Sequence, residues 1–316
     1  MRDSQLRVGI VVNPKHARSR RAYSWLVPTL RREHIRYRSI STTRASAGAE
    51  QARALVAWGA DLVIVLGGDG TLRAIAPVLA AADIPTMVIP TGTANVLARH
   101  VGAGSVRHAV EACIGAVSTF DELRTVDVAV NEVDVLNADG HRQRCHFLSM
   151  SGIGGDARAV GGHGSGPGLL GYVRGGARAL LAPTITLTID GQTSEVWSVM
   201  ASKVSHPAGP ISVFPSAEVV RDDFEFLTVD VGEPGSRLGD WARIAIDGLS
   251  RRHADNPALH YWTAPEATIR LEVPAPAHLD GDLIGDCREM RIRAGTLRLT
   301  ILLATSGAAR CRRARG

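Results

Sequence analysis

The sequence lacks long hydrophobic runs and any patterned set of cysteines. Its longest apolar runs, such as DLVIVL at 61–66 and LTILLA at 299–304, fall far short of the roughly 20 residues that span a bilayer. The first residues, MRDSQLRVGIVV, do not have the architecture of a signal peptide. The four cysteines have neither metal-ligand nor disulfide-framework spacing, which suits a reducing compartment. We therefore expect a soluble, cytoplasmic protein.

Lysine is also scarce, and several catalytic motifs are missing. Only Lys15 and Lys203 are lysines among the 36 basic residues, and neither completes the G-x-x-x-x-G-K pattern of a P-loop. The sequence contains no G-x-S-x-G elbow, no H-E-x-x-H pair and no C-x-x-C pair, so the common serine-hydrolase and zinc-enzyme patterns are absent. The net charge of +5 includes a basic tail, RCRRARG, without neighbouring aromatic residues. We expect a solvated terminus there and no nucleic-acid partner.

The first third of the chain alternates strand-like with helix-like segments. With 316 residues, 45% of them hydrophobic and 21% charged, the chain is long enough for two globular domains. The alternation predicts an α/β domain over residues 1–125, built on a mostly parallel sheet that binds ligands beyond the carboxyl ends of its strands. Strands are expected at 6–14, 36–42, 61–66 and 85–90, and helices at 20–33, 47–59, 71–82 and 93–101.

From about residue 125 the pattern changes to short strand-like stretches separated by Gly, Asp and Pro. This pattern predicts a β-rich, sandwich-like domain over residues 126–316, and the last strands could alternatively return to the first domain. The strand-like stretches lie at 125–140, 144–154, 184–202, 224–232, 267–275 and 290–304.

A glycine-rich loop, GGDGT at 67–71, stands between an apolar strand and a helical pattern. It could be a simple strand-to-helix turn in which Asp69 or Thr71 caps the helix. Alternatively, the glycines let backbone N–H groups approach phosphate oxygens at the helix N-terminus, and Asp69 meets the phosphates through Mg²⁺. A second loop, IPTGTANVLAR, follows the next strand and repeats the design with Gly92, Thr93 and Asn95, which favours the phosphate-binding alternative.

The two loops together resemble the catalytic domain of the diacylglycerol kinase and sphingosine kinase family, particularly the bacterial soluble lipid kinases. Further segments are similar to the family: NP at 13–14, STTRASAGAEQA at 41–52, FLSMSGIGGDARAV at 147–160, FPSAEVVRDDFEFLTV at 214–229 and HLDGD at 278–282. The resemblance implies a nucleotide-binding function for the first domain and a lipid-binding function for the second. It also implies ATP contacts at Asn13, Pro14, Thr43, Gly67, Gly68, Asp69, Gly70, Thr71 and Thr93.

The resemblance also implies a structural Mg²⁺ site and a catalytic base in the second half. Asp222 would bind the metal with the carbonyl groups of Val219 and Phe224. Asp280 and Asp282 would form the base that removes a proton from the lipid hydroxyl, and a carboxylate is a reasonable proton acceptor for an alcohol that attacks a γ-phosphoryl group. Without the resemblance, Asp280 and Gly281 would be expected to form a hairpin turn.

These observations lead to an ATP- and Mg²⁺-dependent lipid kinase that phosphorylates diacylglycerol or a related lipid, transiently at the inner membrane surface. A homodimer is compatible with the sequence. An NAD kinase-like enzyme is an alternative, because that family also uses GGDGT and an Asn-Glu motif that Asn131 and Glu132 could supply. A non-catalytic lipid-binding regulatory protein is another alternative, because Asp282 stands where the family usually has Glu. The segment around Leu169, Leu170 and Val173 could form a lipid entrance or a core-packing helix.

Overall fold

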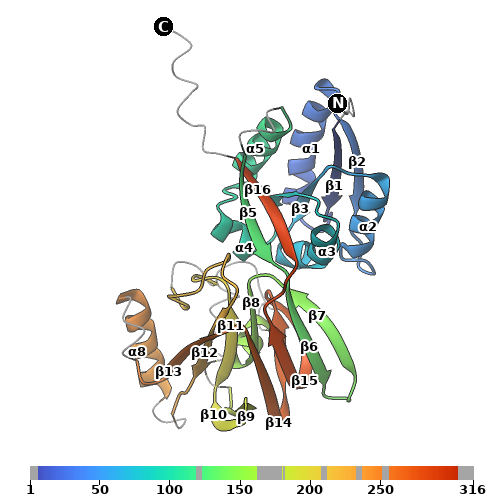
Figure 1. Cartoon of the computed structure of the whole chain (residues 1–316). Coiled ribbons are helices and arrows are strands. Elements are labelled where there is room, and N and C mark those ends of the chain that lie inside the picture. The colour runs from blue at the N-terminus through green and yellow to red at the C-terminus, as the bar shows by residue number, and fades with distance from the viewer. Residues whose placement is uncertain are drawn as a thin grey trace. The chain divides into compact units, whose positions relative to one another are not determined.

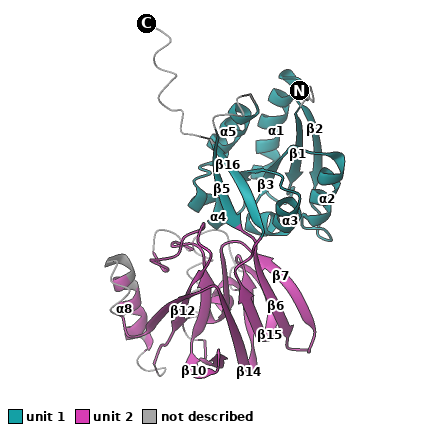
Figure 2. Ribbon diagram, in the orientation of Figure 1, with its two compact units in different colours: residues 1–128, 297–316 teal, residues 129–296 magenta. Residues whose placement is uncertain are grey.

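The computed structural model describes residues 6–118, 123–161, 180, 182–207, 212–232, 237–250 and 256–304. Two compact units divide the chain (Figure 2): unit 1 comprises residues 1–128 and 297–316, and unit 2 comprises residues 129–296. The proposed lipid entrance at Leu169, Leu170 and Val173 lies outside the described residues. No helix in the described ranges is long and apolar enough to cross a membrane.

Unit 1 is an α/β fold with six strands in the order β2-β1-β3-β4-β16-β5. Strands β1, β2, β3 and β4 pair in parallel, and β16 is parallel to β4 with Ile301 opposite Thr86. The strands are β1 (Arg7–Val12), β2 (Arg36–Ser41), β3 (Leu62–Gly67), β4 (Thr86–Pro90), β5 (Leu123–Ala129) and β16 (Arg298–Ala304), and the helices are α1 (Ala17–Arg32), α2 (Ala49–Trp58), α3 (Asp69–Ala81), α4 (Val96–Val101) and α5 (Val106–Ser118).

The strand sequences explain the central position of β3 in this sheet. All six residues of β3 are buried, as expected for a strand that helices cover on both faces. Helices α1 and α5 share one apolar cluster with alternate residues of the strands, such as Ile10 and Ile64. Leu55 of α2 lies against the other face, because a Cβ atom on Gly9 would meet its side chain at 2.9 Å. The predicted α/β fold of the first half is confirmed.

Unit 2 is an antiparallel, ten-stranded sheet with the order β13-β12-β11-β8-β14-β15-β6-β7, and β9 joins it beside β14 and pairs with β10 (Figure 1). Its apolar core contains Phe147, Phe224 and Phe226 with aliphatic residues from most of the strands. The strands are β6 (Asn131–Asn137), β7 (Arg142–Phe147), β8 (Met150–Gly154), β9 (Ile185–Ile189), β10 (Gln192–Val196), β11 (Ser198–Ser202), β12 (Phe224–Val229), β13 (Leu259–Ala264), β14 (Glu266–Leu279) and β15 (Asp282–Arg293), and the helices are α6 (Gly155–Gly161) and α8 (Arg237–Ser250). The predicted β-rich character of the second half is confirmed.

The structure differs from the sequence prediction in the limit between the units and in several elements. The division after Val128 falls within β5, three residues beyond the predicted limit, and residues 297–316 are part of unit 1, which is the alternative named for the last strands. Strand β16 is assigned there because it pairs with β4 and β5, and Figure 1 shows it beside β5. Helices α5, α6 and α8 and strand β13 were not anticipated. Helix α4 begins only at Val96 because Asn95 adopts a left-handed backbone conformation with φ of 47°.

Candidate functional site

The predicted ATP-contacting residues of unit 1 come together at one edge of the parallel sheet. Asn13 and Pro14 follow β1, Thr43 follows β2, the GGDGT loop begins at the end of β3, and Thr93 follows β4. Since these four strands are parallel neighbours, all these segments lie beyond the same carboxyl edge. This is the edge at which open α/β sheets bind their ligands.

Close backbone contact holds the two glycine loops together. A Cβ atom on Gly68 would lie 3.0 Å from the Cα of Gly92. A Cβ atom on Gly67 would lie 2.7 Å from the Thr71 side chain. The glycines therefore permit the packing of one loop against the other, in addition to any approach of backbone N–H groups to a ligand.

Hydrogen bonds between neighbouring strand ends fix the loop conformations. Asn13 Nδ2 donates to Thr71 Oγ1 at 3.1 Å, and the hydroxyls of Ser19 and Thr91 lie 2.7 Å apart in a hydrogen bond. The Asn95 side chain accepts from the Gly92 N–H and donates to its carbonyl oxygen, at 2.9 and 2.8 Å. Thr71 is buried, with 5% of its surface exposed, so its hydroxyl serves the connection between the loops. Thr43 and Thr93 are exposed.

Asp69 connects the first loop to the helix that follows the second. Its Oδ1 accepts a hydrogen bond from the Leu97 N–H at 3.3 Å, within the first turn of α4. Asp69 is also the first residue of α3, where the initial backbone N–H groups have no partners within the helix. The loop and helix amides fit phosphate oxygens, and a half-buried carboxylate beside them fits a Mg²⁺ ligand. The N-cap of α3 is Gly68, so the expectation that Asp69 or Thr71 caps this helix is wrong, whereas the hydrogen bond from Leu97 to Asp69 is compatible with metal binding.

In unit 2, Asp280 forms the turn of the long β14–β15 hairpin. Asp280 and Gly281 have φ values of 49° and 82°, as a two-residue type I′ turn requires, and Leu279 pairs with Asp282. The Asp280 carboxylate accepts four hydrogen bonds from the 148–150 segment. Their donors are the N–H groups of Leu148, Ser149 and Met150 and the Ser149 hydroxyl, at 2.9, 2.8, 3.1 and 2.6 Å.

The two predicted base residues therefore differ in environment. Asp280 is 8% exposed and its carboxylate anchors the turn, whereas Asp282 begins β15 and is exposed. The structure brings the two residues into one turn, as the sequence spacing predicts. The Asp282 carboxylate faces solvent, whereas the Asp280 carboxylate is engaged within the turn.

A buried pair next to this turn was not found from the sequence. His278 Nε2 lies 2.8 Å from Asp156 Oδ2, and His278 Nδ1 accepts the Gly281 N–H at 3.3 Å. Since Nδ1 is an acceptor, Nε2 carries the ring proton and donates it to Asp156. The Ser198 hydroxyl also donates to Asp156 at 2.6 Å, and Gly152 leaves the space, because a Cβ atom there would lie 1.7 Å from Asp156 Oδ2. These contacts support the turn that carries Asp280.

In the loop predicted to bind a structural Mg²⁺, positively charged side chains donate hydrogen bonds to oxygen atoms next to the predicted ligand Asp222. Asp222 is exposed, and both carboxylate oxygens of Asp223 accept hydrogen bonds from the Arg221 guanidinium at 2.7 Å. Arg221 also holds the pKa of the Asp223 carboxyl below its ordinary value. The carbonyl oxygen of Arg221 accepts a hydrogen bond from Lys203 Nζ at 2.6 Å. Within the described part of the chain, no three His, Cys, Asp or Glu side chains are grouped so as to hold a metal ion.

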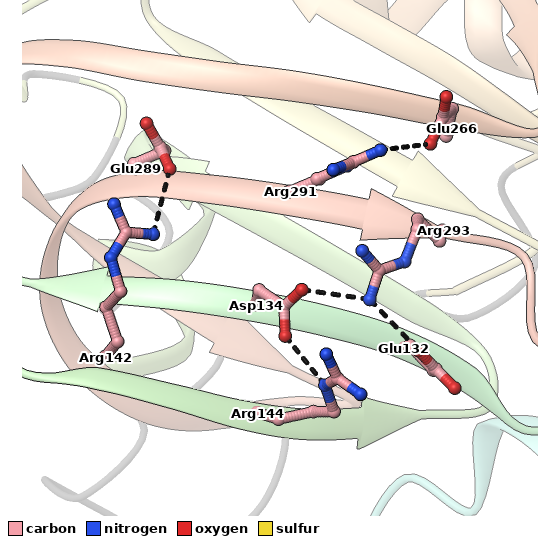
Figure 3. A network of polar contacts seen from close by, with 8 residues as sticks. All are labelled: Glu132, Asp134, Arg142, Arg144, Glu266, Glu289, Arg291 and Arg293. Carbon is pink, nitrogen blue, oxygen red and sulfur yellow. Dashed lines mark hydrogen bonds and ion pairs between the residues drawn. The ribbon is translucent and has the colours of Figure 1, made fainter.

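Glu132 of the Asn131–Glu132 motif belongs to an ion-pair network on the strands of unit 2 (Figure 3). Arg293 reaches Glu132 at 3.1 Å and Asp134 at 2.9 Å, and Arg144 reaches Asp134 at 2.8 Å. Glu132 therefore has an ion-pairing role here, which gives no support to the NAD kinase alternative.

Comparison with known proteins finds a family likeness in residues 7–130. This segment matches the diacylglycerol kinase catalytic domain. The resemblance expected from the two glycine loops is thereby confirmed. A 49-residue stretch is 51% identical to the diacylglycerol kinase of Mycobacterium tuberculosis, in both strain H37Rv and strain CDC 1551, and the match spans 16% of this chain and 16% of those relatives.

Solved structures share the fold of this chain at low sequence identity. A candidate diacylglycerol kinase from Bacillus anthracis str. Sterne superposes with a TM-score of 0.68 at 20% identity, covering 96% of this chain and 98% of that one. Yeast NADH kinase in complex with NADH gives a TM-score of 0.58 at 11% identity, covering 96% and 85%. At these identities the likeness establishes a shared fold for the whole chain, common to lipid kinases and NADH kinase.

Proposed function

We propose that the protein is an ATP- and Mg²⁺-dependent lipid kinase that phosphorylates the hydroxyl of diacylglycerol or a related lipid. The contact between the GGDGT loop and the Gly92 loop, within a diacylglycerol kinase catalytic domain, carries this proposal. Through this contact, backbone amides at helix N-termini and the Asp69 carboxylate lie along one edge of the sheet. Amide donors of this kind bind the phosphate oxygens of a nucleotide.

In the proposed reaction, unit 1 binds the phosphates and unit 2 supplies the base. The amides of the two loops and of the first turn of α3 orient the phosphate chain, and Asp69 would hold Mg²⁺, which supplies charge neutralisation when bound. Asp282 accepts the proton of the lipid hydroxyl. The hydroxyl oxygen then forms a bond to the γ-phosphorus, the bond to the β-phosphate oxygen breaks, and ADP leaves. Asp280 keeps Asp282 in place through the hydrogen bonds that anchor the turn.

The direct test is transfer of labelled phosphate from ATP to a lipid panel. The panel contains diacylglycerol, monoacylglycerol, ceramide, sphingosine and phosphatidylglycerol, and NAD is assayed in parallel. We expect Mg²⁺-dependent labelling of one lipid, loss of labelling in Asp69→Asn, and normal labelling in Gly115→Ala, whose new methyl group meets open space. Labelling of NAD without any lipid product would replace the proposal with the NAD kinase alternative.

A non-catalytic lipid-binding protein would behave differently in the same assay. It would label no lipid and yet bind lipid vesicles, and Asp282→Glu would create activity by restoring the usual family residue. Activity in the wild-type chain excludes this alternative. We further propose that the lipid substrate is met at a membrane surface, which sedimentation with diacylglycerol-containing vesicles tests.

A further inference from the structure

Lys203 is a buried lysine in the middle of unit 2. Only 1% of its surface is exposed, and it follows directly after β11. Its backbone N–H donates to the Ser149 carbonyl oxygen at 2.8 Å, which ties it to the segment that binds Asp280. A buried ammonium group is costly unless it is paired and hydrogen-bonded, so its surroundings must compensate the charge.

The compensation comes from the loop that precedes β12. Lys203 Nζ donates to the Arg221 carbonyl oxygen at 2.6 Å and lies 4.6 Å from the centroid of the Phe224 ring. The ammonium group therefore has a carbonyl dipole and an aromatic face beside it.

The groups around the Lys203 ammonium are ones that stabilise a positive charge. They belong to the 219–224 loop, for which the family resemblance implies a structural Mg²⁺. A magnesium ion there would share the 219–224 backbone with an ammonium group and a guanidinium group. Mg²⁺ also requires several oxygen ligands, whereas the Arg221 carbonyl oxygen of this loop already accepts from Lys203, and both oxygens of Asp223, the neighbour of the predicted ligand Asp222, accept from Arg221. The ammonium and guanidinium groups beside Asp222 therefore disfavour a divalent cation there.

We propose that the Lys203 ammonium is the resident cation of the 219–224 loop and that this protein folds the loop without a structural Mg²⁺. The side chain bridges the loop to β11 and, through its own backbone, to Ser149, which contacts Asp280. The inference concerns the architecture of unit 2 and does not depend on kinase activity.

Thermal unfolding in the absence of nucleotide tests the proposal. Wild type, Lys203→Met and Asp222→Asn are each unfolded in excess EDTA and in millimolar Mg²⁺. We expect the wild-type Tm to be the same in both conditions and Asp222→Asn to behave like wild type. Lys203→Met should lower the Tm by about 5 to 10 °C, since it leaves the loop without its cation. Lys15→Met is the matched control at the other lysine, which is exposed, and should leave the Tm unchanged.

A rise of the wild-type Tm with Mg²⁺ that Asp222→Asn abolishes would overturn the proposal, because it would place the metal at the predicted ligand. If Mg²⁺ raises the Tm of Asp222→Asn as much as that of wild type, the ion binds elsewhere in the protein, and this result supports the proposal. The wild-type and Asp222→Asn comparison decides the matter even if Lys203→Met does not fold. A stable Lys203→Met protein with an unchanged Tm would also overturn it. Because no measurement uses ATP or lipid, a failure of the kinase proposal leaves these outcomes interpretable.

Discussion

Gly68 and Gly92 lie backbone against backbone at the carboxyl ends of β3 and β4, so closely that a Cβ atom on Gly92 would lie 2.6 Å from the Cα of Gly68. Real Cβ atoms do not approach a backbone atom so closely, and a backbone atom cannot move aside as a flexible side chain can. The two glycines therefore determine how near the two proposed phosphate-binding loops come to each other.

Gly92→Ala should separate the loops and weaken ATP binding. Forcing a methyl group into a closed contact typically costs about 1–3 kcal/mol, and the displaced amides would no longer converge on one phosphate chain. We expect at least a roughly tenfold increase in the Kd for ATP, measured by calorimetry, with a lower Tm. Gly115→Ala is the control, because it lies in α5 with nothing within 4 Å of the new Cβ atom and should stabilise the helix slightly. Unchanged ATP affinity in Gly92→Ala would contradict the proposed role of the contact.

Asp69→Asn separates helix capping from metal binding. Asn keeps an oxygen that can accept the Leu97 N–H, but it removes the negative charge. We expect a Tm within about 2 °C of wild type, and a large loss of phosphate transfer that added Mg²⁺ does not restore. Asp69→Ala should lose both stability and transfer. If Asp69→Asn retains full transfer, Asp69 is only a cap.

Replacement of Asp280 should mainly lower the stability of the protein, whereas replacement of Asp282 should mainly lower its activity. Asp280→Ala leaves three backbone N–H groups and the Ser149 hydroxyl without their acceptor, so it should cost about 3 kcal/mol or more of unfolding free energy. Asp282→Asn is a change at an exposed position and should leave unfolding by urea unaltered while abolishing lipid phosphorylation. Full activity in Asp282→Asn would exclude it as the base.

His278→Ala should act through the turn. It removes the acceptor of the Gly281 N–H and leaves Asp156 without its donor from the histidine ring. We expect a lower kcat with little change in the KM for ATP, because unit 1 binds the nucleotide in our proposal. His278→Gln, which can supply one of the two hydrogen bonds, should recover part of the kcat. If His278→Ala and His278→Gln lose the same fraction of kcat, and if the ratio of kcat/KM for one lipid to that for another stays as in wild type, the role of His278 is purely structural.

The ion-pair network makes the stability of unit 2 depend on acid pH. The Arg144 hydrogen bond is the main reason that the pKa of the Asp134 carboxyl lies below its ordinary value, and Arg293 adds to the effect. A carboxyl whose pKa is lower in the folded state contributes stability above its unfolded pKa of about 3.9, and this contribution is lost as the pH falls through the folded value. Asp134→Asn should therefore reduce stability at pH 7 and narrow the gap between urea unfolding at pH 7 and pH 2.5. Because both partners are solvent-exposed in part, the effect should shrink in high salt.

The grouping of the proposed ATP-binding segments at one edge of the sheet could be predicted because these segments follow strand ends that are close in sequence. Gly67, Asp69 and Gly92 lie at or directly after the end of an apolar stretch that indicates a buried parallel strand. Neighbouring parallel strands bring such segments to one edge of the sheet. The Asp280–Gly281 turn was also readable, since Asp-Gly between two strand patterns favours a type I′ hairpin.

Contacts between distant segments could not be predicted in the same way. Asp156 and His278 are separated by 122 positions, and neither has a neighbour in sequence that indicates the pairing. Lys203 carries no sequence signal of burial, because only the packing of β11 against the 219–224 loop encloses it. The return of the last strand, β16, to unit 1 was named as an alternative from the sequence, but only the open edge of β4 in the folded sheet selects it.

The sequence by itself determined the strand and helix patterns, the glycine loops and the Asp-Gly turn, because local periodicity and backbone freedom specify these features. Only the tertiary structure decided that Gly68 meets Gly92, that Asp280 is an anchor while Asp282 is accessible, and that a buried lysine donates a hydrogen bond to the loop in which a metal was expected. Those relationships depend on which surfaces meet after folding, and the free energy that fixes them comes from burial and hydrogen bonding between segments far apart in the chain.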